Sequence, residues 1–416
     1  MSTQQSWFVW SVVGVWSLGV PGPAWGQGGE APSPEPQRSI KQMLKITWTR
    51  GPNLPQGFQD SDGGIVGNTL VTACGFCSGK KLAAKPGRYP RGFLKKVWGL
   101  DLANEKASWR VLPDFPGSAR QENIAIVIGD VLYCWGGFSY SAPYCYKDGH
   151  RLSVSNGKWV WQPLPTLPWV ICSSGICAIG SKIYVCGGAD YDRERFYTET
   201  DRAGKNTRLG AHLLVIDTEN LKAGWKRLTD CPGTPRWVAG TAAVRGKIYV
   251  IGGATGNLTR GGKKYGYCTV VDNWVYDPGT DTWARTRDLP ISSGNFPSGA
   301  IGSKDRYILL IGGHQYGHVA NPDGTVRVKY GRAGRFEGKG AYHNDVFVYD
   351  TQTDLFGRAD SLPINNNLPM AVVRGDEVFL IGGETGGGTV EGEPYGHHPD
   401  LLLRGKISVL KARTTK

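Results

Sequence analysis

Residues 247–253 read Lys-Ile-Tyr-Val-Ile-Gly-Gly, a short run of β-branched and aromatic residues that stops on two glycines. Variants of this run recur at residues 132–137, 183–188, 308–313 and 378–383. A degenerate copy at 70–75 has Cys74 in place of the first glycine. The last glycines of the six runs lie at 75, 137, 188, 253, 313 and 383, with spacings of 62, 51, 65, 60 and 70 residues. The chain therefore repeats one structural unit of about sixty residues.

Each unit predicts four short strands. Upstream of the glycine pair, a small apolar stretch and a polar turn such as Arg245-Gly246 predict an antiparallel hairpin. Downstream, a third strand ends in aspartate, as at residues 274–277, and a fourth begins with an aromatic residue and runs into Leu-Pro, as at residues 283–290. Such units arranged around an axis form a propeller, so we predict an all-β, six-bladed β-propeller.

The two ends of the chain are predicted to meet in one blade. Residues 46–55 look like a fourth strand without the preceding three, and the unit after Gly383 lacks a strand with the Trp…Leu-Pro pattern. We therefore expect the N-terminal strand to complete the last blade. This pairing closes the ring and leaves no free sheet edge.

The chain before the propeller predicts two further segments. Residues 8–20 are apolar but too short to span a bilayer, and small residues near position 25 suit a cleavage site, so residues 1–26 predict an export signal. Since no Lys or Arg precedes the apolar run, a disordered or membrane-surface leader is the alternative. Residues 27–44 predict a Pro/Gly-rich linker, and 45–416 the propeller. We expect a monomeric extracytoplasmic protein, periplasmic or secreted, without a transmembrane span once the signal is removed.

The net charge indicates which class of partner the protein binds. The chain has 48 Lys and Arg against 35 Asp and Glu, a net charge of +13, which favours anionic partners such as acidic glycans. Nucleic acid is disfavoured because no recognition helix, RNA-binding strand signature or basic arm accompanies the charge.

The nine cysteines are an odd number for an exported chain. Most are expected to be small buried residues, and the loop cysteines Cys77, Cys145 and Cys268 could form one disulfide whose pairing the sequence leaves open. The loop histidines, including His397 and His398, show no tight ligand spacing with carboxylates or cysteines. We therefore predict no metal site and no cofactor.

A ligand site is predicted on one face of the propeller. The loops after the glycine pairs are long and emerge together on that face, whereas the opposite turns are short. The alternative is that these insertions are tolerated without a binding function. Residues after each Leu-Pro would rim the channel beside these loops. Amides and guanidinium groups bind hydroxyl and carboxylate groups, and tryptophan stacks on sugar rings, so we predict a small-molecule sugar or acidic glycan. The candidate binding residues are Asp60, Arg120, Gln121, Asn123, Arg236, Trp237, Asn295, His314 and Asn366. The alternative for Arg120 is an ion pair with Glu122 across a blade junction.

These features resemble a known family. Four strands, a Gly-Gly and a spaced tryptophan per unit resemble the Kelch repeat over nearly the whole chain. Residues 115–122 (FPGSARQE) are similar to the second blade of the Kelch-type N-acetylneuraminate (sialic acid) mutarotases, and residues 382–387 (GGETGG) to their terminal blade. The resemblance implies an exported six-bladed propeller that accelerates exchange between the α and β anomers of sialic acid.

Anomer exchange needs a base for the anomeric hydroxyl proton and an acid for the ring oxygen. The resemblance implies a Glu directly after a middle blade's Gly-Gly and an Arg six residues later, and these places hold Ala254 and Arg260. Glu122 and Glu384 are candidate replacements for the carboxylate, so the catalytic candidates are Glu122, Arg260 and Glu384. Two hypotheses stay open: a sugar mutarotase or epimerase, and a non-catalytic Kelch module that binds another exported protein or a surface polymer.

Overall fold

The structure is a computed structural model of the 416-residue chain. It describes residues 40–77, 79, 91–140, 143–190, 208–256, 259–260, 263–264, 268–291, 293–299, 301–316, 318–320, 326–328 and 341–410. The predicted export signal, residues 1–26, and most of the predicted linker lie outside the described residues. Within them, η1 (Leu221–Ala223) is a single turn of 3-10 helix, and no described helix is long and apolar enough to cross a membrane.

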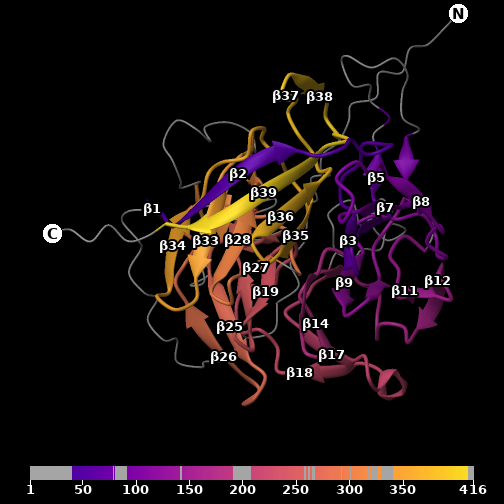
Figure 1. The fold of residues 1–416 in the computed structure, drawn as a ribbon. Helices are drawn as coiled ribbons and strands as arrows, with labels where there is room; N and C mark the ends of the chain where they lie inside the picture. The colour runs from indigo at the N-terminus through magenta and orange to yellow at the C-terminus, as the bar shows by residue number, and fades with distance from the viewer. Residues whose placement is uncertain are drawn as a thin grey trace, which may run out of the picture.

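Six sheets carry the fold, antiparallel apart from one short parallel pair. Each is built from the strands of one repeat, without the short strands of the insertions, except where the chain ends meet (Figure 1). The first three sheets contain β3 (Asp62–Val66), β4 (Thr69–Ala73), β7 (Val97–Asp101) and β8 (Arg110–Leu112); β9 (Ile124–Ile128), β10 (Val131–Trp135), β11 (Gly149–Ser155) and β12 (Lys158–Leu164); and β13 (Gly175–Ile179), β14 (Lys182–Cys186), β17 (Leu213–Asp217) and β18 (Lys226–Leu228).

The other three sheets bring the chain ends into the ring. They contain β19 (Gly240–Val244), β20 (Lys247–Ile251), β25 (Asn273–Asp277) and β26 (Thr282–Thr286); β27 (Gly302–Ser303), β28 (Tyr307–Ile311), β33 (Val346–Asp350), β34 (Leu355–Arg358) and β1 (Lys41–Gln42); and β35 (Met370–Arg374), β36 (Glu377–Ile381), β39 (Leu402–Val409) and β2 (Leu44–Arg50). Strand β2 pairs antiparallel with β39 from Leu44↔Val409 to Arg50↔Leu403, and Figure 1 shows the two side by side. Part of the segment expected to be linker, Lys41–Gln42, pairs with β34.

The innermost strands form a closed circle. Strand β3 contacts β9, β9 contacts β13, β13 contacts β19, β19 contacts β27, β27 contacts β35, and β35 returns to β3. Buried aliphatic side chains of neighbouring sheets pack together between the blades, as Val71 and Ala73 of the first do with Ala125 and Leu132 of the second. Burial of these faces provides the main favourable free energy of the fold.

The repeated glycine pair is explained by backbone geometry. Gly252 and Gly253 have φ of +61° and +100°, and a Cβ at Gly253 would lie 2.7 Å from the carbonyl oxygen of Trp237. Only glycine adopts such a conformation without strain. In the degenerate first copy Cys74 takes φ +67°, so the turn is kept there at the cost of a left-handed non-glycine residue.

The repeated tryptophan links one blade to the previous one. The indole Nε1 of Trp161 donates to the carbonyl of Pro113 at 2.9 Å, and Trp283 donates to Thr229 at 2.8 Å. In both cases the acceptor lies just before the apolar-Pro step that ends the preceding blade. The spaced tryptophan is therefore a structural residue of the repeat.

Further short strands lie in the insertions after the glycine pairs. They include β5 (Phe76–Cys77) with β6 (Gly92–Phe93), β15 (Ala189–Asp190) with β16 (Arg208–Leu209), β22 (Thr259–Arg260) with β23 (Lys263–Lys264), β29 (His314–Gln315) with β32 (Ala341–Tyr342), and β37 (Gly388–Val390) with β38 (Glu393–Tyr395). In addition, β21 (Ala254–Thr255), β24 (Cys268–Val270), β30 (His318–Ala320) and β31 (Val326–Val328) form a sheet that joins the fourth and fifth insertions.

The cysteines and the surface charge qualify two expectations. All nine cysteines are buried thiols and none forms a disulfide in this structure, which corrects the expectation that the loop cysteines could pair.

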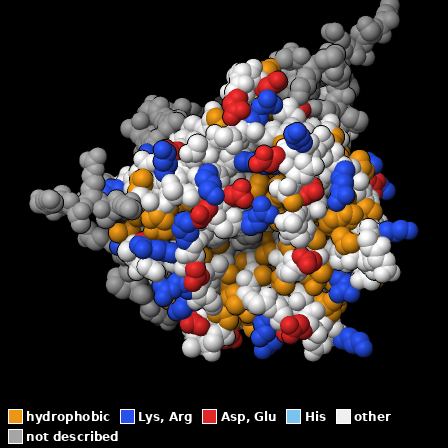
Figure 2. Space-filling view, in the orientation of Figure 1, with side chains coloured by type: hydrophobic (Ala, Val, Ile, Leu, Met, Phe, Trp, Pro, Cys, Tyr) orange, Lys and Arg blue, Asp and Glu red, His pale blue; other side chains and the backbone are white. Residues whose placement is uncertain are grey.

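On the face shown in Figure 2, basic and acidic side chains are interspersed, with hydrophobic side chains gathered between them toward the lower centre. The positive net charge does not form a continuous basic patch on that face.

Candidate functional site at the channel mouth

Each blade contributes one residue at an equivalent position beside the central channel, and we call these six the channel ring; all but Asn295 line a cavity there. They share a left-handed backbone, with φ of 53° at Asp60, 52° at Glu122, 55° at Ser173, 47° at Val238, 59° at Asn295 and 52° at Leu368. Four of the ring amides donate to the preceding member's carbonyl, as Glu122 does to Asp60 at 3.1 Å and Ser173 to Glu122 at 3.1 Å. The backbone thus fixes the direction in which each ring side chain leaves the chain.

A second set of six residues, which we call the rim, directly follows the glycine pairs. Each forms a β-bridge with the residue that directly precedes a channel-ring member. The rim consists of Phe76, Phe138, Ala189, Ala254, His314 and Glu384. Glu384 is therefore the one carboxylate at this position of the repeat.

The floor of the mouth holds three carboxyl groups. Burial and the nearby Glu122 raise the pKa of Asp60 well above its usual range, and the same two causes raise the pKa of Asp62 to about 8. Burial raises the pKa of Glu122 to about 7, although hydrogen bonds from Ser173 and Gln121 act in the opposite direction. Side chains with such pKa values exchange protons readily near neutral pH.

Two cavities with common lining residues lie at the channel. The one at the channel ring has a volume of about 60 Å³; acidic and hydroxyl side chains line one side, and Val238, Phe296 and Leu368 line the other. A larger cavity of about 300 Å³ lies along the first strands and shares Asp62 and Pro369 with the first. One wall with polar groups and one apolar wall suit a ligand that has both polar edges and C–H faces.

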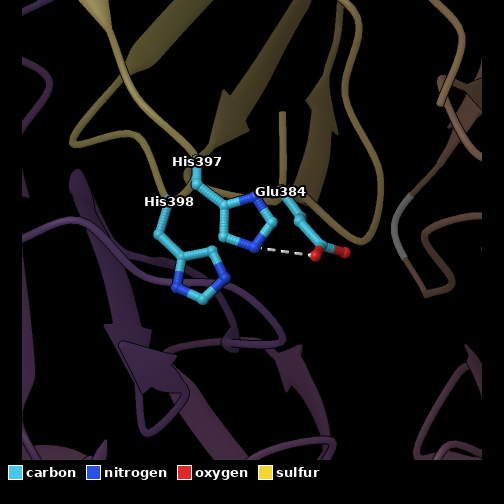
Figure 3. Close-up of side chains that lie close together, drawn as sticks. All are labelled: Glu384, His397 and His398. Carbon is cyan, nitrogen blue, oxygen red and sulfur yellow. Dashed lines mark ion pairs between the residues drawn. The ribbon is translucent and has the colours of Figure 1, made fainter. Parts of the chain in front are cut away.

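At the rim, Glu384 is held by several donors, and Figure 3 shows its contact with His397. Its Oε1 lies 3.0 Å from Nε2 of His397, and its Oε2 accepts a hydrogen bond of 3.0 Å from Nδ2 of Asn367. Burial alone would raise the pKa of Glu384, but hydrogen bonds from His397, Tyr342 and Asn367 outweigh it and lower that pKa to about 2. Glu384 is therefore an ionised carboxylate at neutral pH.

His314 lies on the same side of the mouth. Its ring packs at 4.5 Å from the ring of Tyr316 and 5.4 Å from that of Tyr342. Burial lowers the pKa of His314 to about 4, although the charge of Glu384 acts the other way, so the imidazole is neutral at pH 7. The hydroxyl of Tyr316 donates to Oδ1 of Asn295 at 3.1 Å, which links His314 to the channel ring.

Two predicted sugar-binding arginines lie inside the blades instead. Arg120 is 1% exposed and forms an ion pair with Asp148 at 2.7 Å, and Arg236 is 3% exposed and forms one with Asp272 at 2.5 Å. Their guanidinium groups also donate to the carbonyls of the glycine turns, Gly136 and Gly252. They stabilise the repeat and do not face a ligand, and the proposed pairing of Arg120 with Glu122 is also wrong.

The remaining predicted residues differ in where they lie. Asp60, Glu122 and Asn295 belong to the channel ring, and Gln121 and Trp237 bridge to rim residues. Buried Asn123 lines the cavity at the channel ring and donates to Sγ of Cys134 at 3.1 Å. Asn366 donates to the carbonyl of Gly382 at 2.9 Å and serves the framework. The side chain of Arg260 lies outside the described part of the chain.

Comparisons with known proteins agree with this architecture. A family model described as Kelch motif matches residues 239–290. The chain has a β-propeller fold that contains a Kelch motif. The solved structure titled "Structure of YjhT" has the same fold, with a TM-score of 0.62 at 18% identity over 87% of this Kelch protein and 99% of that chain.

Curated relatives of this Kelch propeller share a printed name. It is similar to the N-acetylneuraminate epimerase of Haemophilus influenzae (strain 86-028NP), with 25% identity over 81% of this chain and 88% of the relative. The N-acetylneuraminate epimerases of Pasteurella multocida (strain Pm70), at 23% over 81% and 89%, and of Salmonella typhimurium (strain LT2), at 25% over 73% and 81%, are also similar.

The sequence did not identify two parts of the site. The pairing of Glu384 with His397 was missed because the two are separated by an insertion that does not repeat, although both follow the same glycine pair. The contribution of Tyr342 was missed because it reaches Glu384 from the insertion of the neighbouring blade. The repeat itself located part of the channel ring, since Asp60, Glu122 and Asn295 were candidates whereas Val238 and Leu368 were not.

Proposed function

We propose that this protein binds a sugar at the channel mouth and catalyses anomer exchange of the N-acetylneuraminate type. The observation that carries the proposal is the carboxyl group of Glu122, whose pKa is about 7, on the floor of the mouth. A group that is partly protonated at neutral pH can donate a proton to a ring oxygen and accept one from an anomeric hydroxyl. The name shared by the curated relatives supports the same substrate class.

Glu384 supplies the second carboxylate in this proposal. The family resemblance implies a Glu after the Gly-Gly of a middle blade, whereas this chain has Ala254 there and Glu384 two blades later. Because blades are related by rotation about the channel, a carboxylate at the same position of another blade still faces the same mouth. Glu384 would accept hydrogen bonds from sugar hydroxyls, and Glu122 would transfer the protons.

The rate of anomer exchange tests the assignment. We would follow N-acetylneuraminate anomers by NMR with wild-type protein, Glu122→Gln, Glu384→Gln and the exposed control Glu219→Gln. Loss of a general acid–base is expected to slow the catalysed exchange about 10²- to 10⁴-fold in Glu122→Gln, while the control keeps the wild-type rate. Unchanged exchange in Glu122→Gln would reject its catalytic role, and no acceleration by wild-type protein would reject the activity.

A non-catalytic binding module is the second candidate. Ala254, which is fully buried, occupies the place where the family resemblance implies a catalytic Glu. A ligand that binds only the folded protein raises its melting temperature by mass action. A thermal shift with N-acetylneuraminate or another sugar, without accelerated exchange, would favour this candidate. We also propose export to an extracytoplasmic compartment from residues 1–26, and cell fractionation tests it.

A further inference from the structure

The two ring nitrogens of His397 both face acceptors. Nδ1 lies 3.2 Å from the carbonyl oxygen of Thr385, which can only accept a hydrogen bond. Nε2 lies 3.0 Å from Oε1 of Glu384, a carboxylate oxygen that also only accepts. A neutral imidazole has one N–H, so it can donate to only one of these two acceptors. A second proton or a cation bound at Nε2 satisfies both contacts at once.

The surroundings of both groups match those of metal ligands. A ligating histidine usually donates its other ring N–H to a backbone carbonyl or carboxylate, and a ligating carboxylate is itself hydrogen-bonded. His397 meets the first condition through Thr385, and Glu384 meets the second through Asn367. Two donor atoms 3.0 Å apart, each about 2.1 Å from an ion, subtend an angle of about 90°, which suits octahedral coordination.

A third donor lies beside them. The ring of His398 stacks on that of His397, with centroids 4.6 Å apart and planes inclined by 18° (Figure 3). One donor atom from each of Glu384, His397 and His398 lies within 4.8 Å of the others. Because stacked rings direct their lone pairs in parallel, the His398 ring must rotate when all three bind one ion.

We propose that Glu384, His397 and His398 form a binding site for a divalent first-row transition-metal ion at the channel mouth. Two imidazoles and one carboxylate suit Zn²⁺, Co²⁺ or Ni²⁺, whereas Ca²⁺ and Mg²⁺ prefer oxygen donors. The side chain of Glu384 is 8% exposed and that of His397 is 20% exposed, so the ion is shielded but reachable from the mouth. The site replaces the sequence-based expectation of no metal, and it does not depend on the proposed activity.

An ion bound at this site would also give the channel mouth a positive charge. The guanidinium groups of Arg120 and Arg236, which were predicted to bind a sugar carboxylate, are occupied by Asp148 and Asp272. A divalent ion held by one carboxylate keeps a net positive charge and an open coordination position. It would therefore attract a carboxylate or hydroxyl oxygen of a ligand to the rim.

Metal titration of the untagged, chelator-treated full chain tests the proposal. We would add Co²⁺ and Zn²⁺ separately, measuring Co²⁺ by its visible absorption and Zn²⁺ by competition with a chromophoric chelator. We expect one ion per chain, binding at least 100-fold weaker in His397→Gln and Glu384→Gln, and about 10- to 100-fold weaker in Asn367→Ala, which removes only a supporting hydrogen bond.

His150→Gln is the matched control. His150 lies 3.8 Å from the carboxylate of Asp148, and its side chain is 18% exposed, close to the 20% of His397. Its replacement removes a histidine–carboxylate contact away from the proposed site. The control is expected to keep wild-type affinity. Circular dichroism melts of each variant in the absence of metal establish that it is folded, and His398→Gln serves as a second variant. Absence of a one-to-one ion in wild-type protein, or unchanged affinity in folded His397→Gln, would overturn the proposal.

Discussion

Replacing Glu122 with Gln is expected to stabilise the protein above about pH 4.5, and the stabilisation should grow as the pH rises toward 7. Burial raises the pKa of Glu122 from 4.5 to about 7 in the folded state. Below pH 4.5 the carboxyl is protonated in both the folded and the unfolded chain, so its contribution to stability is fully present there. As pH rises toward 7, the unfolded chain loses the proton first, and the free energy of unfolding falls.

The size of the effect follows from the pKa change. A rise from 4.5 to about 7 corresponds to roughly 3 kcal/mol, because one pKa unit is about 1.36 kcal/mol. Glu122→Gln keeps an oxygen that can accept from Ser173 and removes the buried charge. The variant should therefore match wild type near pH 4.5 and exceed it by up to about 3 kcal/mol at pH 8.

Urea denaturation between pH 4.5 and 9 measures this difference. The exposed control Glu219→Gln is expected to run parallel to wild type across the range. If the curves of wild type and Glu122→Gln are parallel as well, the carboxyl does not titrate differently in the folded protein, and the reasoning on its pKa fails.

Three other substitutions test the framework by urea denaturation. Ile46→Ala, in the N-terminal strand and 2% exposed, should cost about 2–5 kcal/mol, whereas exposed Thr47→Ala should stay within about 0.5 kcal/mol; equal effects would contradict a structural role for this strand. Asp272→Ala leaves the buried charge of Arg236 unpaired and should lower the free energy of unfolding by about 3–5 kcal/mol. A decrease under about 1 kcal/mol would contradict the stabilising role of this ion pair. Gly253→Ala places a Cβ 2.7 Å from the Trp237 carbonyl oxygen at a residue with positive φ, so it should destabilise the protein. Wild-type stability of this variant would refute the requirement for glycine at the turn.

The fold was predictable because its sequence signals are local and repeated. The glycine pair marks a turn that requires positive φ, and residues 247–251 form β20 as the apolar run before it predicts. The all-β Kelch architecture is confirmed. Six copies of the same weak pattern reinforce one another, which a single copy could not do.

The candidate site was less predictable because side-chain partners are not local. Arg120 and Arg236 have the residue type of a ligand-binding group, but Asp148 and Asp272 lie 28 and 36 residues further along the chain and bind them inside the blades. Glu384 and His397 meet only because an irregular insertion folds back onto the rim. The repeat located positions around the channel, whereas non-repeating loops decide what those positions contact.

The channel ring separates the chemistry of the mouth from the stability of the blades. Its six members share one backbone conformation and hold it largely through main-chain hydrogen bonds, yet their side chains range from Asp and Glu to Val and Leu. Substitutions at these six positions can therefore change what the channel recognises while the surrounding blades stay intact. A propeller of this kind is a suitable starting scaffold for evolving or engineering new ligand specificity, one blade at a time.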